Sequence, residues 1–499
     1  MFEFLLSGSI SATCIVAMVV AVLVYWCIQK MKYNFPPGPP GLPLIGNVFQ
    51  MSTDRLHEQV YEWSKKYGPV ITLRVGRTPS VFVNDIESAL EVLVKKSNDF
   101  ASRKPSSSMQ VLSYNGKDIV FGEYSPTWKL LRRLSVKALR HYMQADALNQ
   151  RVQDAVSEVF KAIDNIKGEF DPSDYMNFIV AHILSGLCFG GKYSFGDPDV
   201  TFVAKKLDEL NKAMEKGFKE DYFPIIKTIY KTKNFRFFED VIRELVDEFL
   251  KQKYAEANET FNKDNMRHFC DNLILARQEL EAEGQDMTSL TEDHFLQTFN
   301  DIYMAGIDTS RFTLIWCINY MTAFPDIQEK VQEEIDRVVG KDRMPHIDDR
   351  PNLGYTEAVL HEAMRMSSIV PLGIPHMTTR DTEIAGYKIP GGTEVVINHY
   401  ALHYEPTAWK EVDRFIPERY LDEDGKLGPK PQSWLPFSAG TRVCLGEFVA
   451  KPELHLIFAS LMQKYKWKMV SGKCANFTTW GNVLGRFCKP FKVIVEKRI

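Results

Sequence analysis

The sequence predicts one large, mainly α-helical domain with a small β part, placed behind an N-terminal membrane-spanning helix. Three observations lead to this fold class. Apolar residues recur at steps of three and four over most of the chain, as between Phe238 and Phe249, which is the period of an amphipathic helix. β-Branched runs around Gly/Pro turns occur at 70–83 and 382–398, and each predicts a hairpin. Residues 10–28 carry no charge.

The uncharged run 10–28 predicts an uncleaved membrane anchor over residues 1–29. As a helix it would span about 28 Å, close to the thickness of a bilayer core. The alternative is a cleaved signal peptide, but the charges of Lys30 and Lys32 follow the run, and no small-residue cleavage site separates it from the body. By the positive-inside rule, we expect a single-pass anchor with the rest of the chain in the cytosol.

A proline-rich linker, residues 30–49, follows the anchor and includes "FPPGPPGLPLIGN". Such a segment is too rich in proline for a helix or a central strand, so it predicts a stiff spacer. No proline- or serine-rich stretch divides residues 50–499, which we therefore interpret as one domain. Its 45% of hydrophobic and 25% of charged residues are typical of a globular protein.

Charge and cysteine content exclude several classes of function. The 61 basic residues nearly balance the 64 acidic ones, so the sequence predicts no nucleic-acid partner. The eight cysteines include no C-x-x-C pair, which argues against a disulfide framework and a zinc site of that type.

One cysteine, Cys444, lies in the loop "PFSAGTRVCLGE" (436–447) with a glycine on either side. A cysteine thiolate can hold a haem iron. Gly440 and Gly446 would allow a close backbone approach and positive φ angles, and a helix beginning near residue 445 would stabilise a negative sulfur. We expect Phe437 to shield the sulfur and Arg442 to neutralise a haem propionate.

These positions form the pattern F-x-x-G-x-R-x-C-x-G, which resembles the haem-ligand loop of the cytochrome P450 monooxygenases. The resemblance implies haem b with the thiolate of Cys444 as axial ligand to the iron. A buried structural cysteine is the alternative interpretation. Further motifs of the family occur in order along residues 36–446, and they favour the interpretation of Cys444 as the haem ligand.

The segment "AGIDTS" (305–310) is similar to the oxygen-activation motif of that family, which lies on a long central helix. The resemblance implies that Ala305 contacts the haem, that Gly306 leaves room for dioxygen, and that Asp308 and Thr309 deliver protons. The alternative is that Thr309 only hydrogen-bonds to its own turn. Arg311 departs from the family pattern, and we expect it to face away from the site.

"HEAMR" and "PERY" match a buried ion network of the family formed by Glu362, Arg365 and Arg419. The implied role is structural, because the network supports the core behind the haem loop, and breaking it should lose haem. Tyr420 replaces the more common phenylalanine, a change from which we expect little effect.

Four further residues match propionate contacts of microsomal members. Trp128 and Arg132 in "WKLLR" lie one helical turn apart, and the others are Arg103 and His376. A lone histidine is more often a packed polar residue, so the assignment of His376 as a propionate contact depends on the resemblance.

The resemblance implies a monooxygenase that inserts one oxygen atom into a lipophilic substrate at the endoplasmic reticulum membrane. NADPH-cytochrome P450 reductase would supply electrons, with cytochrome b5 as a second candidate donor and with Arg133 and Lys137 at the docking face. The chain most resembles the branch of steroid 17-hydroxylases and aromatic-hydrocarbon hydroxylases. The segments expected to contact substrate are 109–121, 201–230, 297–309, 369–374 and 479–485.

Two alternatives from other classes remain. One is a haem-thiolate binding or sensing protein without turnover, which would not need the proton-delivering residues Asp308 and Thr309. The other is an isomerase or dehydratase on the same fold that works without a reductase. NADPH consumption in the presence of reductase and a substrate panel separates the three.

Overall fold

The computed structural model describes most of the domain and little of the chain before it. The described residues are Ala17, Val20, 33–42, 45–52, 54–76, 78–142, 145–222, 224–470, 477–482 and 484–499. The expected anchor, residues 1–29, therefore lies outside the described residues except for Ala17 and Val20. Within the described part, no helix is both long and apolar enough to cross a membrane.

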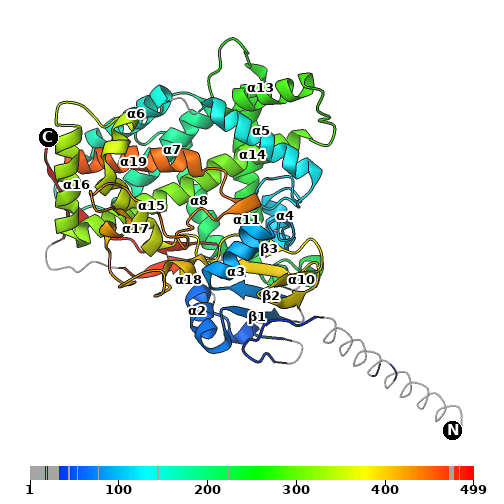
Figure 1. Cartoon of the computed structure of the whole chain (residues 1–499). Coiled ribbons are helices and arrows are strands. Elements are labelled where there is room, and N and C mark those ends of the chain that lie inside the picture. The colour runs from blue at the N-terminus through cyan, green and yellow to red at the C-terminus, as the bar shows by residue number, and fades with distance from the viewer. Residues whose placement is uncertain are drawn as a thin grey trace, which may run out of the picture.

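Helices make up most of the described chain, as the hydrophobic period predicts (Figure 1). Those of the first half are α2 (Leu56–Tyr67), α3 (Ile86–Leu90), α4 (Ser107–Leu112), α5 (Pro126–Tyr142), α6 (Ala145–Ile163), α7 (Ser173–Phe189), α8 (Pro198–Met214), α9 (Lys219–Tyr222), α10 (Pro224–Ile229) and α11 (Lys233–Ile242). Those of the second half are α12 (Lys251–Glu259), α13 (Phe269–Ala282), α14 (Glu292–Asn300), α15 (Gly306–Ala323), α16 (Pro325–Val338), α17 (Gly354–Ser367), α18 (His399–His403) and α19 (Glu447–Lys464).

Shorter helical turns of two other kinds interrupt or join these helices. π-Helical turns are η2 (Glu91–Lys95), η3 (Arg243–Leu250) and η4 (Asp301–Ala305). Turns of 3-10 type are η1 (Val48–Gln50), η5 (Ile347–Asn352), η6 (Pro417–Tyr420) and η7 (Gly440–Arg442). The π-turn η4 runs directly into α15, and such widened turns often occur at functional sites.

Among the described residues, the β part consists of one four-stranded sheet and three two-stranded ones. The larger sheet has the order β1-β2-β6-β3, formed by β1 (Val70–Val75), β2 (Thr78–Val83), β6 (Glu394–Ile397) and β3 (His376–Met377). The pairs are β4 (Thr382–Ile384) with β5 (Tyr387–Ile389), β7 (Tyr465–Met469) with β10 (Val493–Lys497), and β8 (Thr479–Gly481) with β9 (Arg486–Cys488).

The hairpin predicted at 70–83 is confirmed, because β1 and β2 pair antiparallel in register Val70 to Val83. The hairpin predicted over 382–398 is wrong in extent. Ala385 and Gly386 both have positive φ and close a tight turn between β4 and β5. Residues 394–397 instead pair in parallel with β2, a partner more than 300 positions away, and so join the other sheet.

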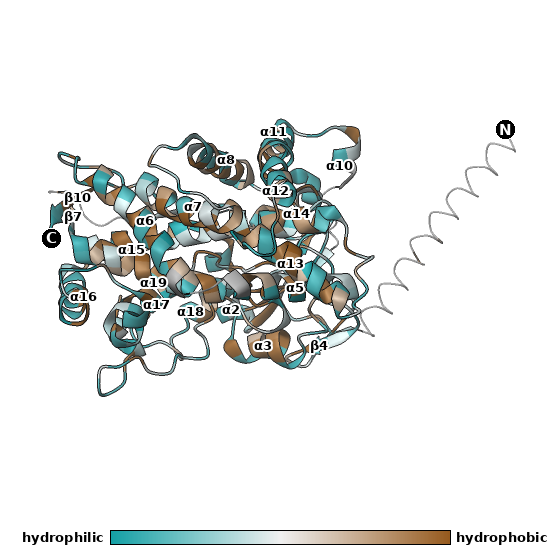
Figure 2. Ribbon diagram, turned by 90° about the horizontal axis from the view of Figure 1, so that it is seen from above, coloured by the Kyte–Doolittle hydropathy of each residue, from teal (hydrophilic) through white to brown (hydrophobic). Residues whose placement is uncertain are grey.

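The largest buried cluster runs through α5 to α8, α15, α17 and α19, and a smaller one lies under the four-stranded sheet. Figure 2 shows hydrophobic residues along much of α15 and α19, whereas α16 at the edge is mostly hydrophilic. In α15 every residue from Ser310 to Thr322 is buried. The helix predicted to carry the "AGIDTS" segment is thus a central element of the core.

Candidate active site

The loop around Cys444 is held by close backbone contacts. Gly440 has a φ of +72°, and a Cβ there would lie 1.6 Å from the carbonyl oxygen of Leu93, so only glycine fits. The Cys444 amide donates to the Phe437 carbonyl over 3.0 Å. Gly446 has a φ of −81°, so the positive φ expected there is wrong. A Cβ added at Gly446 would lie 3.9 Å from the Cys444 sulfur.

Cys444 is exposed in the structure, although surrounding protein atoms desolvate its thiol. Burial raises the pKa of the thiol, while the backbone N–H groups of Gly446 and Glu447 and the charge of Arg132 act in the opposite direction. Glu447 is the first residue of α19, so the predicted helix N-terminus does point at the sulfur. A thiol in this environment becomes a thiolate when a metal ion coordinates it.

Three arginines from distant segments gather next to this loop. Arg442 donates to the carbonyls of Ala101, Ile119 and Gly122 at 2.7, 3.1 and 2.6 Å. Arg103 donates to the carbonyls of Val120, Ile374 and Pro375 at 3.0, 2.7 and 2.9 Å. Arg132 donates to the Val443 carbonyl at 2.6 Å. The structure thus brings together all three arginines that the sequence nominated.

Positive charge in this cluster exceeds the negative charge beside it. Burial first, and the neighbouring arginines second, lower the pKa of Arg442 to about 8. Burial, with a smaller contribution from Arg132, likewise lowers the pKa of Arg103 to about 9. Asp118 offsets part of the charge on both, although burial raises its own pKa to about 6. Buried cations are expensive unless paired, so this cluster favours an anionic group with more than one carboxylate.

Trp128 and His376 also lie in the arginine cluster. The guanidinium carbon of Arg442 lies 3.9 Å from the centre of the Trp128 ring, and that of Arg132 lies 5.6 Å away. The Trp128 indole donates to the Ile119 carbonyl over 2.9 Å. His376 Nδ1 lies 2.8 Å from the Phe100 carbonyl. Burial, with the charges of Arg103 and Arg442, puts the pKa of His376 well below its usual value, so the ring is neutral here.

Only two residues between Asp301 and Ala323 are exposed, namely Ala305 and Thr309. They lie one turn apart on one face of the central helix, although that helix is otherwise embedded in the core. The Thr309 hydroxyl donates to the Ala305 carbonyl over 2.8 Å, which is the local bond that the sequence left as an alternative. Its oxygen lone pairs remain able to accept a hydrogen bond at this accessible surface.

Gly306 does not have the role expected from the sequence. A Cβ at this position would meet the Leu184 Cδ1 of α7 at 2.7 Å, so the glycine allows α7 and α15 to pack closely. The prediction that it leaves room for dioxygen is therefore wrong, because its missing side chain points at a neighbouring helix.

Asp308 is turned toward α8. Its Oδ2 accepts from Asn211 Nδ2 over 2.7 Å, and its Oδ1 lies 2.8 Å from Arg311 Nη2. Burial raises the pKa of Asp308, while Arg311 and Asn211 counteract this. Arg311 is 1% exposed and is packed against α7 and α8, so it faces away from Thr309 as expected.

The predicted ion network is present behind the Cys444 loop. Arg365 donates twice to Glu362 at 2.8 Å, and Arg419 donates to Glu362 Oε1 at 3.2 Å. Glu362 and Arg365 are completely buried. The Tyr420 hydroxyl adds a bond of 3.3 Å to Glu362 Oε2, which a phenylalanine could not make; that this replacement has little effect stays a prediction. Arg365 also holds the His403 carbonyl at 2.9 Å, which ties α17 to α18.

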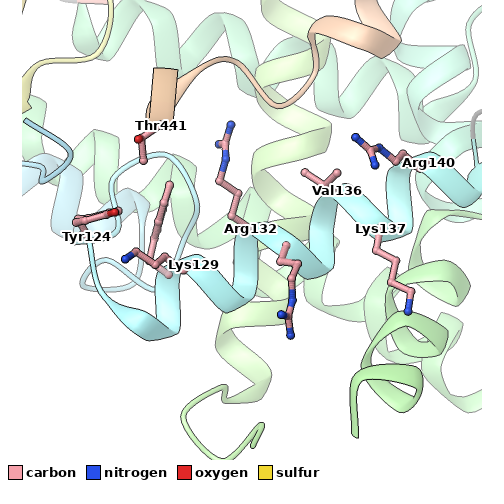
Figure 3. A pocket seen from close by; sticks show the side chains of 9 residues that line it. Tyr124, Lys129, Arg132, Val136, Lys137, Arg140 and Thr441 are labelled. Carbon is pink, nitrogen blue, oxygen red and sulfur yellow. The ribbon is translucent and has the colours of Figure 1, made fainter. Parts of the chain in front are cut away.

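A groove of about 770 Å³ runs along α5 beside the Cys444 loop. We call it the basic groove; it is lined by Tyr124, Trp128, Lys129, Arg132, Arg133, Val136, Lys137, Arg140 and Thr441. Its α5 residues recur at three- and four-residue steps and so share one face. Figure 3 shows Arg132 and Arg140 directed toward the side of Thr441, whereas Lys137 points away. Lys137 pairs with Glu279 at 2.8 Å and Glu283 at 3.3 Å.

Comparison with known proteins decides the family. The family model described as Cytochrome P450 matches residues 36–495. The chain belongs to the cytochrome P450 family. Cytochrome P450 1A1 of Chelon auratus is 32% identical over 486 residues, which are 93% of this chain and 92% of that protein. Steroid 17-alpha-hydroxylase/17,20 lyase of Gallus gallus is 33% identical over 467 residues, 90% of this chain and 91% of the relative. Cytochrome P450 2U1 of Mus musculus is 33% identical over 497 residues, which are 95% of this chain and 92% of that protein.

The protein is therefore a cytochrome P450 monooxygenase, and its cofactor is haem b held by a cysteine thiolate. The predicted resemblance to the branch of aromatic-hydrocarbon and steroid 17-hydroxylases is confirmed by the names of these relatives. The residues present fit the cofactor. An exposed cysteine lies at a helix N-terminus, and beside it three arginines favour a group with two carboxylates.

Sequence reasoning missed the polar residues that surround Asp308. Asn211 of α8 donates to Asp308, and Asn482 Nδ2 donates to Asn211 Oδ1 over 2.7 Å. It also missed Asp301, whose Oδ2 accepts from the Ile119 amide at 2.7 Å and so fixes the loop that carries Asp118. No local pattern marks these residues, because each partner lies roughly 100 positions or more away.

Proposed function

We propose that this cytochrome P450 is a membrane-anchored monooxygenase that hydroxylates a lipophilic, steroid-like or polycyclic substrate. Residues 1–29 would anchor it in the endoplasmic reticulum membrane, 30–49 would form the linker, and 50–499 would form the haem-binding domain in the cytosol. The observation that carries the proposal is the exposed Cys444 at a helix N-terminus, together with an accessible threonine, Thr309, on an otherwise buried central helix.

The haem-binding residues take distinct roles in this proposal. Cys444 ligates the iron, and the Gly446 and Glu447 amides stabilise its sulfur. Phe437 and Gly440 shape the Cys444 loop, and Ala305 would contact the haem. The propionates bind the cluster formed by Arg103, Trp128, Arg132, His376 and Arg442. When bound, haem supplies the reductive cleavage of dioxygen, with one oxygen atom going to the substrate and the other to water.

The catalytic residues of the proposal are Thr309 and Asp308. Thr309 presents its hydroxyl oxygen at the accessible face of α15, so it can accept a hydrogen bond from a reacting group and pass on a proton. Asp308, the neighbouring residue on α15, is the proposed acid that resupplies this proton, although its carboxyl group is turned toward α8. Glu362, Arg365 and Arg419 do not take part in the chemistry and support the loop instead.

NADPH-cytochrome P450 reductase is the proposed electron donor, with cytochrome b5 as a second candidate, and the basic groove is the proposed docking site. Five of the nine lining residues are lysine or arginine. Such a surface fits an acidic partner. Of the two contacts expected from sequence, Lys137 is already paired with two glutamates, and Arg133 donates to Gln285 at 2.7 Å. Lys129 and Arg140 are the better candidates.

The docking site is tested by reversing charge in the groove. Arg140→Glu should raise the reductase concentration required for half-maximal turnover about tenfold at low salt, and the effect should shrink at high salt. The matched control is Arg243→Glu, an exposed arginine of η3 that pairs with Asp240 and does not line the groove. If both variants respond alike, the groove is not the docking site.

The overall function is tested by assaying the purified protein with reductase, NADPH and a panel of steroids and polycyclic aromatic compounds. A monooxygenase gives hydroxylated product with matched NADPH consumption. A sensing protein binds a compound without consuming NADPH, and an isomerase or dehydratase converts a peroxide without reductase. Either of the last two results would overturn the proposal.

A further inference from the structure

Arg311 is a buried cation shared by three helices. Its Nη2 lies 2.8 Å from Asp208 Oδ1 of α8 and 2.8 Å from Asp308 Oδ1 on its own helix, and its Nη1 donates to Asn177 Oδ1 of α7 at 3.1 Å. Arg311 is 1% exposed, Asp308 21% and Asp208 61%. The pair with Asp308 is thus the more enclosed of the two, and an enclosed pair is screened less by solvent.

A second connection joins Asp308 to α8. Asn211 Nδ2 donates to Asp308 Oδ2 over 2.7 Å, whereas Asp308 Oδ1 is in ion-pair contact with Arg311 and has no hydrogen-bond partner among the described residues. Asn211 is in turn held by Asn482, which follows β8. Both Asp208 and Asn211 belong to α8. The position of α8 therefore affects the orientation of Asp308 in two ways: directly through Asn211, and indirectly through Asp208 and Arg311.

Helix geometry separates these partners from the reactive face. Successive residues of an α-helix are about 100° apart, so Arg311 lies about 200° around α15 from Thr309. Asp308 is about 100° from Thr309, on the side that faces α8. It is therefore the residue that joins the accessible face of α15 to the packed face.

The charges around Asp308 affect the pKa values of both Asp308 and Arg311. Burial raises the pKa of Asp308, Arg311 lowers it, and Asp208 adds repulsion. From α7, Asp174 is a further carboxyl group beside Asp208. Burial lowers the pKa of Arg311, but the carboxylates of Asp308 and Asp208 outweigh this and leave it raised. Without Arg311, the Asp308 carboxyl group would keep the repulsion of Asp208 and lose the cation that offsets it.

We propose that Arg311 is a positioning residue for the oxygen chemistry: it holds the Asp308 carboxylate against α8, so that the placement of α8 and the orientation of the acid are set together. This inference rests on the proposed function of Asp308. Because α8 lies in the segment 201–230 expected to contact substrate, an α8 displaced by substrate entry takes Asp208 and Asn211 away from Arg311 and Asp308. The acid is then in place only when α8 has closed.

The test compares Arg311→Met and Arg311→Lys in the haem-loaded protein, each also combined with Asp308→Asn. Arg311→Met should lower product per NADPH about fivefold at equal haem content, which corresponds to about 1 kcal/mol. Arg311→Lys should restore part of it, because lysine keeps the charge but cannot bridge two carboxylates in a fixed fork. In the Asp308→Asn background, Arg311→Met should have no further effect on product per NADPH.

A second measurement does not depend on turnover. Amide hydrogen exchange of α8 should be faster in Arg311→Met and in Asp208→Asn than in the wild type. The matched control is Arg267→Met, which breaks another pair with a buried aspartate, Asp271 of α13. It should leave both α8 exchange and product per NADPH unchanged.

The inference is overturned if Arg311→Met keeps the wild-type ratio of product to NADPH, or loses as much in the Asp308→Asn background as in the wild type. Unchanged α8 exchange in both Arg311→Met and Asp208→Asn also overturns it. If the wild type itself consumes no NADPH with reductase, the proposed function fails instead, and the exchange measurement still decides whether Arg311 holds α8.

Discussion

A buried carboxyl group on α19 provides the sharpest prediction about stability. Glu453 is 1% exposed, and its Oε1 has no hydrogen-bond partner among the described residues. Burial raises the pKa of Glu453 to about 8. In the unfolded chain a glutamate has a pKa of about 4.3. The folded protein therefore binds one more proton than the unfolded chain between these two pH values.

The sign and the magnitude follow from this difference. Where the folded state binds more protons, the free energy of unfolding falls as pH rises, by about 1.4 kcal/mol per pH unit for one group. From pH 5 to pH 8 the wild type should lose about 4 kcal/mol through Glu453. The loss stops above the folded pKa. Glu453→Gln should remove this dependence, because glutamine does not titrate.

The assay is denaturant unfolding of the haem-loaded protein at pH 5, 6, 7 and 8, with wild type and variant compared at each pH. All other titrating groups are common to both proteins, so their contributions cancel in the difference. The control is Glu423→Gln at an exposed position, which should follow the wild type. Parallel pH curves for wild type and Glu453→Gln would show that Glu453 is not buried in its protonated form.

Three further predictions concern function and anchoring. Thr309→Ala should keep haem and substrate binding, continue to consume NADPH, and release hydrogen peroxide while product per NADPH falls about tenfold; unchanged coupling would leave Thr309 as a packing residue. Glu362→Gln should lose haem instead, because breaking a fully buried pair costs about 3–5 kcal/mol; a normal haem content with poor coupling would contradict the structural role. Deleting residues 1–29 should release much of the protein from membranes with its haem spectrum intact; full retention on membranes would refute the anchor.

Most of the site residues that the sequence predicted were recognised from short local motifs. The pattern around Cys444 identified the loop, because its spacing is set by one tight turn and one helix start. The pairing of Glu362 with Arg365 could also be predicted locally, because residues three apart lie on the same face of a helix. Arg442 was assigned from its place in the Cys444 loop, Arg103 and Arg132 came from the resemblance, and the structure brings all three together.

Long-range pairings could not be predicted from the sequence. Residues 394–397 have the composition of a hairpin strand, and only the parallel alignment with β2 shows that they belong to another sheet. Gly306 was misinterpreted because its neighbour Leu184 lies on another helix. The partners of Arg311 were equally hidden: sequence indicated that it faces away from the site, but Asp208 lies 103 positions away.

The central claim is that the thiolate of Cys444 ligates the haem iron. The most direct measurement is the absorbance spectrum of the reduced protein under carbon monoxide, compared between wild type and Cys444→Ala. The wild type should show the strongly red-shifted Soret band of thiolate-ligated haem, and Cys444→Ala should lack it, since no other described cysteine is exposed. If Cys444→Ala keeps that band, another residue ligates the iron and the assignment of the site is wrong.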